Sequence, residues 1–326
     1  MTAAVPGYAP AHAQGSTPDG AVMTTERRRR GEPQAPRAVA MTMVRDEADM
    51  LPRWIDYYGR QLGVQNLIVL DDNSTDGSTD DLPCTLYRLP PEPWKKRWAG
   101  TRAKLVNGMA RGLLACNDVV IFTDVDEFLV PDPDIYEGLL DYLAHRSDQP
   151  VIAPLAFEVM HNARVEPEFD PDRPLLEQRR FVKFSPAMCK PLLKRVSAAW
   201  EPAFHAIHAP FDVDPELFML HLKYYDETAL AKVAEHRYRI RTTEGRGSPA
   251  SFWSKKPDEL KTLLTTWTSP AQEDDGPVRS VDVEQLRYRN LISKRPDGTW
   301  RADANQVRGL NQSPLQELPE RFRGAF

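Results

Sequence analysis

The chain has 326 residues, a formal net charge of −5 and 41% hydrophobic residues, so its length allows one large domain or two ordinary ones. The acidic balance argues against a general nucleic-acid-binding protein. The three cysteines form no Cys-x-x-Cys pair, which argues against a disulfide framework or a zinc site and favours a reducing compartment. No apolar run approaches the ~20 residues that span a bilayer, so we expect a cytoplasmic protein, with peripheral contact to the inner face of the membrane left open.

Composition separates the two ends from the middle of the chain. Residues 1–36 are rich in Ala, Pro, Gly and Thr without periodicity, and are predicted to form a disordered tail. The arginine run at residues 27–30 is followed by no apolar segment, so we do not interpret it as a secretion signal. From residue 269 the chain turns polar, which predicts a partly irregular C-terminal extension over residues 269–326. We therefore expect the folded domain to span residues 37–268.

Strand-like and helix-like segments alternate in the first half of this domain. The predicted strands cover residues 39–44, 67–70, 85–89, 119–122 and 151–157, and the predicted helices cover residues 51–62, 101–115 and 135–143. Such alternation implies parallel strands joined by right-handed crossovers. After residue 178 the pattern predicts strands at 181–184, 192–196 and 218–222, then a helix at 226–240. The expected fold class is α/β, with a Rossmann-like, mostly parallel sheet flanked by helices and a smaller antiparallel region.

Three of the predicted strands are followed by acidic residues, namely Asp46 and Glu47, Asp71 and Asp72, and Asp124 and Asp126. Open parallel sheets bind ligands beyond the carboxyl ends of their strands, so one crevice is expected to collect all three clusters. Asp124 and Asp126 directly follow the apolar run at residues 119–122. Such a pair of carboxylates could hold Mg²⁺ or Mn²⁺, and through the cation a substrate diphosphate.

Two other interpretations of the acidic segments fit the sequence less well. Asp72, Ser74, Asp76 and Gly77 match the first positions of an EF-hand calcium loop, but Pro83 stands where the bidentate Glu is required. A phosphatase with an aspartate nucleophile would carry Thr or Val four residues after its first Asp, where this chain has Phe128.

Three motifs resemble those of family 2-like glycosyltransferases, and most closely those of the family 92-like subgroup. They are Met43-Val44-Arg45-Asp46-Glu47, Leu70-Asp71-Asp72-Asn73-Ser74-Thr75-Asp76-Gly77 and Phe122-Thr123-Asp124-Val125-Asp126-Glu127-Phe128-Leu129. Order and spacing also match, over about residues 38–240, although Asp46 replaces the usual Asn. The resemblance implies a GT-A fold and metal-dependent, inverting transfer of a sugar from a nucleoside-diphosphate sugar to an acceptor hydroxyl. Residues 37–157 would form the nucleotide-sugar-binding half and residues 158–268 the acceptor-side half.

The resemblance also assigns roles to individual residues. It assigns the metal, Mn²⁺ or Mg²⁺, to Asp126 and Asp124, with Asp124 tending to face the ribose, and to His221 as a third ligand, with His208 and His205 as alternatives. Donor contacts are assigned to Arg45, Glu47, Asp71, Asp72, Ser74, Arg102, Asn107 and Asp124. Lys95, Lys96 and Arg97 are compatible with either a solvated loop or a diphosphate- or acceptor-binding loop.

Direct displacement at the sugar requires a base to take the proton of the acceptor hydroxyl. The candidates are Glu201, which we favour, Asp212 and Glu158. The acceptor could be a saccharide, a lipid-linked molecule or a protein. Two alternatives remain open: a nucleotidyltransferase, which usually has a Gly-rich loop that residues 45–49 lack, and a non-catalytic sugar- or nucleotide-binding module, against which the intact acidic clusters argue.

Overall fold

The fold begins with four parallel strands and two helices. A computed structural model describes residues 34–91, 98–245, 254–269, 278–303, 305–307 and 309–326. The first elements are β1 (Ala38–Val44), α1 (Met50–Leu62), η1 (Val64–Asn66), β2 (Leu67–Asp71), β3 (Thr85–Arg88), α2 (Trp98–Leu113) and β4 (Val119–Phe122). The strand order is β3-β2-β1-β4, and every pairing within it is parallel.

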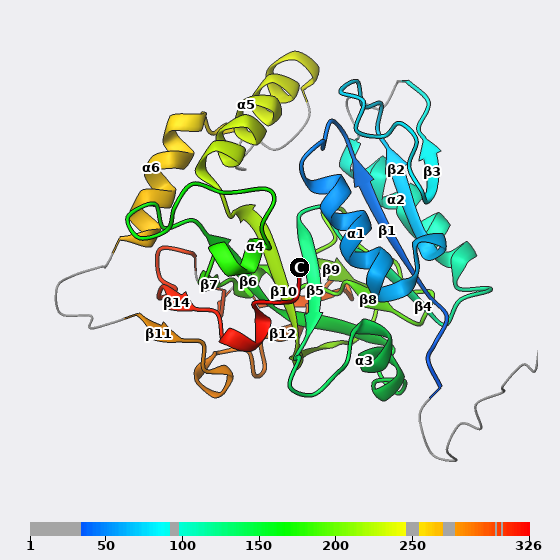
Figure 1. Cartoon of the computed structure of the whole chain (residues 1–326). Helices are drawn as coiled ribbons and strands as arrows, with labels where there is room; N and C mark the ends of the chain where they lie inside the picture. The colour runs from blue at the N-terminus through cyan, green and yellow to red at the C-terminus, as the bar shows by residue number, and fades with distance from the viewer. Residues whose placement is uncertain (1–33, 92–97, 246–253, 270–277, 304, 308) are drawn as a thin grey trace, which may run out of the picture. The chain divides into compact units, whose positions relative to one another are not determined.

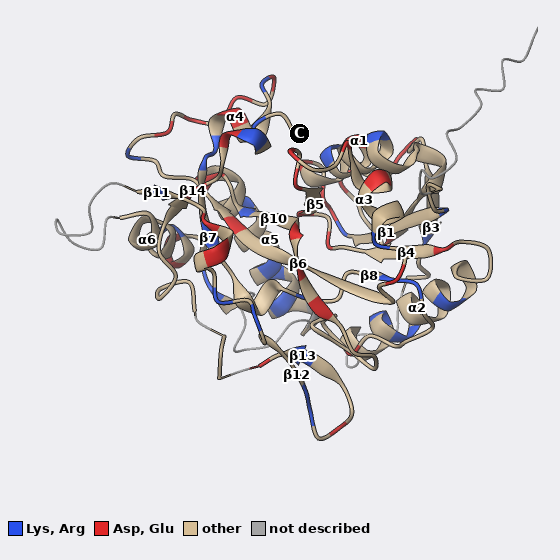
Figure 2. Cartoon of the chain, turned by 90° about the horizontal axis from the view of Figure 1, so that it is seen from below, with Lys and Arg blue, Asp and Glu red and all other residues tan. Residues whose placement is uncertain are grey.

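Local sequence accounts for these elements. Every residue of β1, β2 and β4 is buried, as expected for parallel strands covered on both faces. Helix α1 buries its predicted apolar face, including Leu51, Trp54 and Tyr58, and ends at Gly63, whose φ of 89° suits glycine. In Figure 2, α1 and α3 lie on one side of the strands and α2 lies on the other.

The second half continues the same sheet with mixed pairing. Its elements are β5 (Glu127–Pro131), α3 (Leu139–His145), β6 (Val151–Met160), α4 (Leu175–Gln178), β7 (Phe181–Phe184), η3 (Pro186–Met188), β8 (Leu193–Lys194), β9 (Ala206–Ile207), β10 (Asp212–Tyr224), α5 (Glu227–Glu244) and α6 (Pro257–Thr268). Strand β8 is antiparallel to both β4 and β6, and β10 is parallel to β6 and antiparallel to β5 (Figure 1). The α/β class is therefore confirmed, with a mixed sheet whose first four strands are parallel.

The residues after 268 belong to the same folded unit, which spans residues 34–326. They form β11 (Arg279–Ser280), η5 (Val283–Gln285), β12 (Ile292–Lys294), β13 (Trp300–Ala302), β14 (Gln316–Glu317) and η6 (Glu320–Phe322). Strand β14 pairs with β7, whereas β12, β13 and β9 form a separate antiparallel sheet. Phe322 is fully buried with its ring 4.6 Å from that of Phe218. The expected irregular extension thus contributes strands and core.

Several boundaries differ from expectation. Strand β5 was not predicted, α3 begins four residues later than expected, and β10 extends well beyond residues 218–222. Of the predicted disordered tail, residues 1–33 lie outside the described part of the chain. Among the helices that are described, none combines the length and the apolar character that a membrane crossing requires.

Candidate functional site

The loops that follow β1 and β2 are bonded to each other. The backbone N–H of Asp72 donates to the carbonyl of Val44 at 2.8 Å, and the N–H of Asp46 donates to Ser74 Oγ at 3.0 Å. Asp46 Oδ1 in turn accepts from the N–H of Thr75 at 2.6 Å. Asp46 has a φ of 53°, a conformation that Asn and Asp adopt more readily than most residues. Asp46 can therefore adopt the backbone conformation of the Asn that is usual at this position in the motif. Its carboxylate also joins the first two acidic clusters.

The third acidic cluster forms a tight turn between β4 and β5. The N–H of Glu127 donates to the carbonyl of Asp124, and the N–H of Asp124 donates to Glu127 Oε2, both at 3.1 Å. The carbonyl of Asp126 accepts from the N–H of Leu222 at 2.8 Å, which connects the turn to β10. Neighbouring Thr123 accepts from Trp54 Nε1 at 2.9 Å. The turn is therefore held by its own two bonds and by contacts with two other elements, α1 and β10.

His221 lies between two carboxylates. Its Nε2 is 3.3 Å from Asp126 Oδ2, and its Nδ1 is 2.8 Å from Oε2 of Glu158, which lies opposite His221 in the register of β6 and β10. Burial alone would lower the pKa of His221, but Glu158 and Asp126 raise it to about 10. Burial would likewise raise the pKa of Asp126, yet His221 lowers it to about 2. In this arrangement His221 and Asp126 form an ion pair.

Asp124 is neutralised by two cations from distant parts of the chain. Arg102 Nη2 contacts Asp124 Oδ1, and the buried Lys190 places Nζ 3.6 Å from Asp124 Oδ2 and 2.6 Å from Glu127 Oε1. Although burial raises the pKa of Asp124, Arg102 and Lys190 hold it below its usual range. The Arg102 guanidinium also lies 4.9 Å from the centre of the Phe204 ring. Packing thus fixes the position of Arg102 beside Asp124.

Helix α5 brings two more basic side chains to these loops. Arg237 Nη2 is 3.8 Å from Asp126 Oδ2, and His236 Nε2 is 3.6 Å from Asp46 Oδ2. Burial and then the nearby Asp126 and Asp124 raise the pKa of Glu47 to about 8, although Arg237 opposes this shift. The site therefore crowds several carboxylates together and compensates them with cations from α2, α5, β10 and the loop before β8.

Asp126 and His221 could hold a divalent cation if the cation displaces the proton on His221 Nε2, because a metal-bound imidazole is neutral. The 3.3 Å separation of their donor atoms is close to the roughly 3 Å between neighbouring ligands of an octahedral ion with bonds of about 2.1 Å. Glu158 would orient His221, as carboxylates commonly orient metal-binding imidazoles. Within the described ranges, no group of three or more His, Cys, Asp or Glu side chains is already gathered as a metal site. The two residues would therefore need water or substrate oxygens to complete a coordination shell.

Asp71 and Asn107 have structural partners that account for their polar groups. Asp71 accepts from the N–H of Ser74, from Thr79 Oγ1 and from Arg88 Nη1. The Asn107 side chain bonds both the carbonyl and the N–H of Trp200, at 2.8 and 2.9 Å. These bonds give Asp71 and Asn107 structural roles, and their expected donor contacts stay predictions.

Asp72 differs from Asp71 in its surroundings. Its Oδ2 accepts from Trp98 Nε1, at the start of α2, at 3.1 Å. Both aspartates stay predicted contacts for the base or ribose. Lys95, Lys96 and Arg97 lie outside the described residues.

The alternative histidines and bases are placed differently from His221. His208 pairs with Glu201 at 2.7 Å, with both side chains exposed, while His205 Nδ1 contacts the carbonyl of Ala187 at 2.9 Å. Burial lowers the pKa of His205 to about 4. Asp212 begins β10 and pairs with Ile152, six residues of β6 before the partner of His221, so at ~3.3 Å per residue it lies roughly 20 Å from His221 and we do not propose it as the base.

Sequence reasoning missed Lys190 and Arg237. Lys190 is a single buried lysine in a loop, and Arg237 is one of several basic residues on α5, so neither has a local pattern that marks it. Glu158 was considered only as a base, whereas its contact with His221 gives it an orienting role.

No protein-family model and no curated protein sequence matches the chain. Among solved structures, glucosyl-3-phosphoglycerate synthase from Mycobacterium tuberculosis is 16% identical, with a TM-score of 0.27, over 40% of this chain and 46% of that one. A mannosyltransferase from Pyrobaculum calidifontis, solved with GDP-Man and Mn²⁺, is 14% identical, with a TM-score of 0.29, over 72% of each chain. A cytidylyltransferase from Leptospira borgpetersenii is 10% identical, with a TM-score of 0.22, over 36% of this chain and 53% of that one. The chain thus spans less than half of the glucosyl-3-phosphoglycerate synthase. With TM-scores below 0.5, these similarities are not used to assign a function.

Proposed function

We propose that the chain is a metal-dependent glycosyltransferase that moves a sugar from a nucleoside-diphosphate sugar to an acceptor hydroxyl. The observation that carries this proposal is the convergence of the three motif loops with the Asp126–His221 pair. The carboxyl end of the strands would then hold a nucleotide site, a set of metal ligands and the cations that compensate them. The motif resemblance supports the GT-A assignment and inversion at the sugar, which remain parts of the proposal.

Asp126 and His221 would hold Mg²⁺ or Mn²⁺, with Glu158 orienting His221. The bound cation would neutralise charge on the leaving diphosphate. Arg102 and Lys190 hold the carboxylate of Asp124 in place, where it could accept from a ribose hydroxyl. Asp72, fixed by Trp98, would accept from the base or ribose.

Burial determines how strongly the charges at this site interact with a bound ligand. Two unit charges ~4 Å apart interact by ~1 kcal/mol in water but by ~4 kcal/mol at an effective dielectric near 20. Asp126 and His221 are at least nine-tenths buried, so the larger figure describes their surroundings better. The same charges on an open loop would bind a diphosphate far less strongly.

Glu201 remains our candidate for the base. It lies in the loop that also contains Phe204, whose ring packs against Arg102, and its carboxylate is exposed and paired with His208. An exposed carboxylate on the acceptor-side half can reach an incoming hydroxyl. Replacing Glu201 with Gln should lower kcat by about 100-fold, the lower end for general-base catalysis, and leave donor affinity within about twofold. A change of kcat below about threefold would remove Glu201 from the mechanism.

The decisive experiment measures ligand-dependent thermal stability and donor turnover. Nucleoside diphosphates and their sugars are screened with and without Mn²⁺, and the matching nucleotide should raise Tm in a metal-dependent way. Asp126→Asn should abolish this dependence and donor hydrolysis. Asp134→Asn, in another Asp-x-Asp pair with its side chain 72% exposed, is the matched control. Failure of every nucleotide to stabilise the wild-type protein with Mn²⁺ would overturn the proposal.

A further inference from the structure

A pocket lies at the opposite end of the strands from the Asp126–His221 pair. It has a volume of about 660 Å³ and is formed by the segment before β6, the segment that begins β10, and Trp300 of β13. Six residues of β6 separate Ile152, the partner of Asp212, from Glu158, the partner of His221. At ~3.3 Å per residue the pocket end of these strands therefore lies roughly 20 Å from His221. This volume falls in the range of small-molecule sites, about 300–1,000 Å³.

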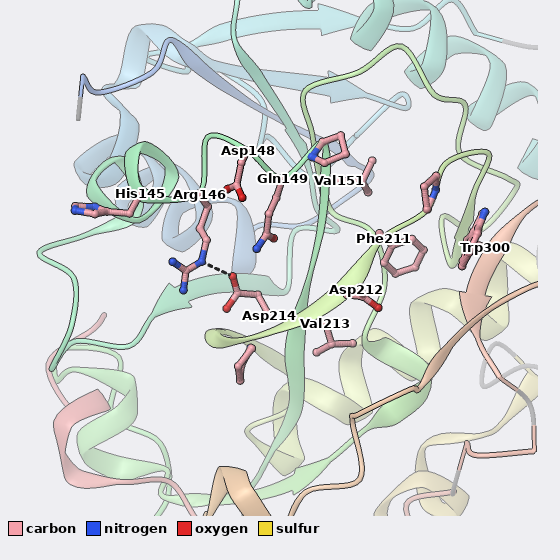
Figure 3. Close-up of a pocket in the computed structure, with 13 residues that line it drawn as sticks. His145, Arg146, Asp148, Gln149, Val151, Phe211, Asp212, Val213, Asp214 and Trp300 are labelled. Atoms are coloured by element: carbon pink, nitrogen blue, oxygen red, sulfur yellow. Dashed lines mark hydrogen bonds and ion pairs between the residues drawn. The ribbon is translucent and has the colours of Figure 1, made fainter. Parts of the chain in front are cut away.

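The pocket has a rigid polar wall. Arg146 Nε donates to Asp214 Oδ2 at 2.8 Å (Figure 3). Tyr142 Oη donates to the same oxygen at 2.8 Å. The Arg146 guanidinium also contacts Glu216 and lies 5.7 Å from the ring centres of Tyr136 and Tyr142. The Asp214 side chain is only 3% exposed. A ligand would therefore meet a preorganised surface that loses little conformational entropy on binding.

The remaining lining combines hydrogen-bonding groups with aromatic rings. Figure 3 shows Asp148 and Gln149 on one side and Phe211 and Trp300 on the other. Within the described part of the chain, the side chains of Asp148, Gln149 and Asp212 make no hydrogen bond or ion pair. Their carboxylate and amide groups can accept from hydroxyls, and the Gln149 amide can also donate. The rings offer flat apolar faces against which C–H groups can pack.

We infer that this pocket binds a neutral saccharide. Three aspartates against one arginine disfavour a phosphate or another anion. A divalent cation is disfavoured because no group of three or more potential ligands converges among the described residues. A sugar ring, with hydroxyls at its edge and C–H groups on its faces, matches both kinds of lining. The pocket is too far from the Asp126–His221 pair to present a reacting hydroxyl there, so this saccharide binding does not depend on the proposed function.

The test uses the full chain and tetrasaccharides of glucose, mannose and N-acetylglucosamine as probes, with binding measured by saturation-transfer NMR and calorimetry. At least one probe should bind saturably. The double variant Gln149→Ala/Asp212→Ala should weaken that binding at least tenfold, and Trp300→Ala should weaken it too, with folding verified by thermal melts. Asp172→Asn, an exposed aspartate on another loop, should leave it unchanged.

Three outcomes would overturn the inference: no probe binds, the pocket variants bind as the wild type does, or spermine or Mn²⁺ occupies the pocket in place of a sugar. If Asp126→Asn abolishes saccharide binding and the pocket variants do not, the sugar binds at the transfer site and the inference is also wrong. The inference and the proposed function can fail separately. Saccharide binding without metal-dependent nucleotide binding would refute only the proposed function. Metal-dependent nucleotide binding without saccharide binding would refute only the inference about the pocket.

Discussion

Two Asp-x-Asp pairs lie at opposite ends of the strands of the same sheet and have different surroundings. We call the carboxyl end of β4 the first edge and the start of β10 the second edge. Asp124 and Asp126 follow the carboxyl end of β4 and contact four cationic groups, those of Arg102, Lys190, His221 and Arg237. Asp212 and Asp214 begin β10, where Asp214 is locked by Arg146 and Tyr142 and Asp212 is exposed. The same spacing therefore gives a dense buried charge cluster at one edge and an open polar pocket at the other.

The difference shows that the spacing of two carboxylates does not determine their chemistry. Loops after three parallel strands converge at the first edge, and the chain supplies balancing cations from remote elements. At the second edge Arg146 pairs with the buried Asp214 and with Glu216, and Asp148, Gln149 and Asp212 line the pocket. Charge should dominate at the first edge, whereas hydrogen bonding and packing should dominate at the second.

The largest effect should come from Lys190→Met, which removes a buried cation at the first edge. Its ammonium lies 2.6 Å from Glu127 and 3.6 Å from Asp124, with its side chain 3% exposed. Breaking a buried ion pair costs about 3–5 kcal/mol, because the partner charge stays buried and unbalanced. Urea unfolding in metal-free buffer should show a loss of that size. Lys261→Met, which breaks an exposed pair with Glu227, should cost less than ~1 kcal/mol. Equal losses of unfolding free energy in Lys190→Met and Lys261→Met would contradict the expected difference between a buried and an exposed ion pair.

A smaller loss of stability is expected from Arg146→Met at the second edge. Asp214 would keep its bonds to Tyr142 and to the N–H of Glu216, so it would remain partly satisfied. Loss of a hydrogen bond to a charged group costs about 1.5–3 kcal/mol. Urea unfolding should place the loss there, and calorimetry should show unchanged nucleotide affinity with Mn²⁺. A change in nucleotide affinity of tenfold or more would show that the two edges are coupled.

The two edges also differ in how far the sequence predicts them. Local periodicity predicts β1, α1, β2 and β4 to within a residue, because each has its own apolar pattern. The acidic clusters follow these strands directly, so the positions of Asp72 and Asp126 follow from topology. His221 required the family resemblance as well, because a lone histidine on an apolar strand has no local signal.

Other features depend on contacts that no local pattern encodes. Strand β10 is longer than expected because β5 and β6, distant in sequence, pair along it. The pocket at the second edge is lined by three separate segments of the chain. One of them contributes Trp300, which lies in the region expected to be an irregular extension. Lys190 and Arg237 are likewise brought to the site by the fold alone. The motif around Asp71 likewise does not reveal that its oxygens accept from Ser74, Thr79 and Arg88.

The smallest expected effect, Arg237→Ala, tests whether helix α5 competes with the metal at the first edge. Arg237 lies 3.8 Å from the same Asp126 oxygen that contacts His221. Removing it should raise the affinity for Mn²⁺ alone by about tenfold, or ~1.4 kcal/mol, because a competing cation is lost. It should also lower nucleoside-diphosphate affinity in saturating Mn²⁺ by about tenfold, because a positive charge near the phosphates disappears.

Titration calorimetry for each ligand separates these opposite changes. Lys232→Ala, an exposed lysine on the same helix, is the matched control and should alter neither affinity. Parallel losses of both affinities in Arg237→Ala would indicate local disruption instead, since damage to the site cannot strengthen metal binding. Opposite changes would mean that Arg237 balances Asp126 in the metal-free protein and faces the diphosphate once the metal is bound, whereas Arg146 at the other edge is already paired with Asp214 and Glu216.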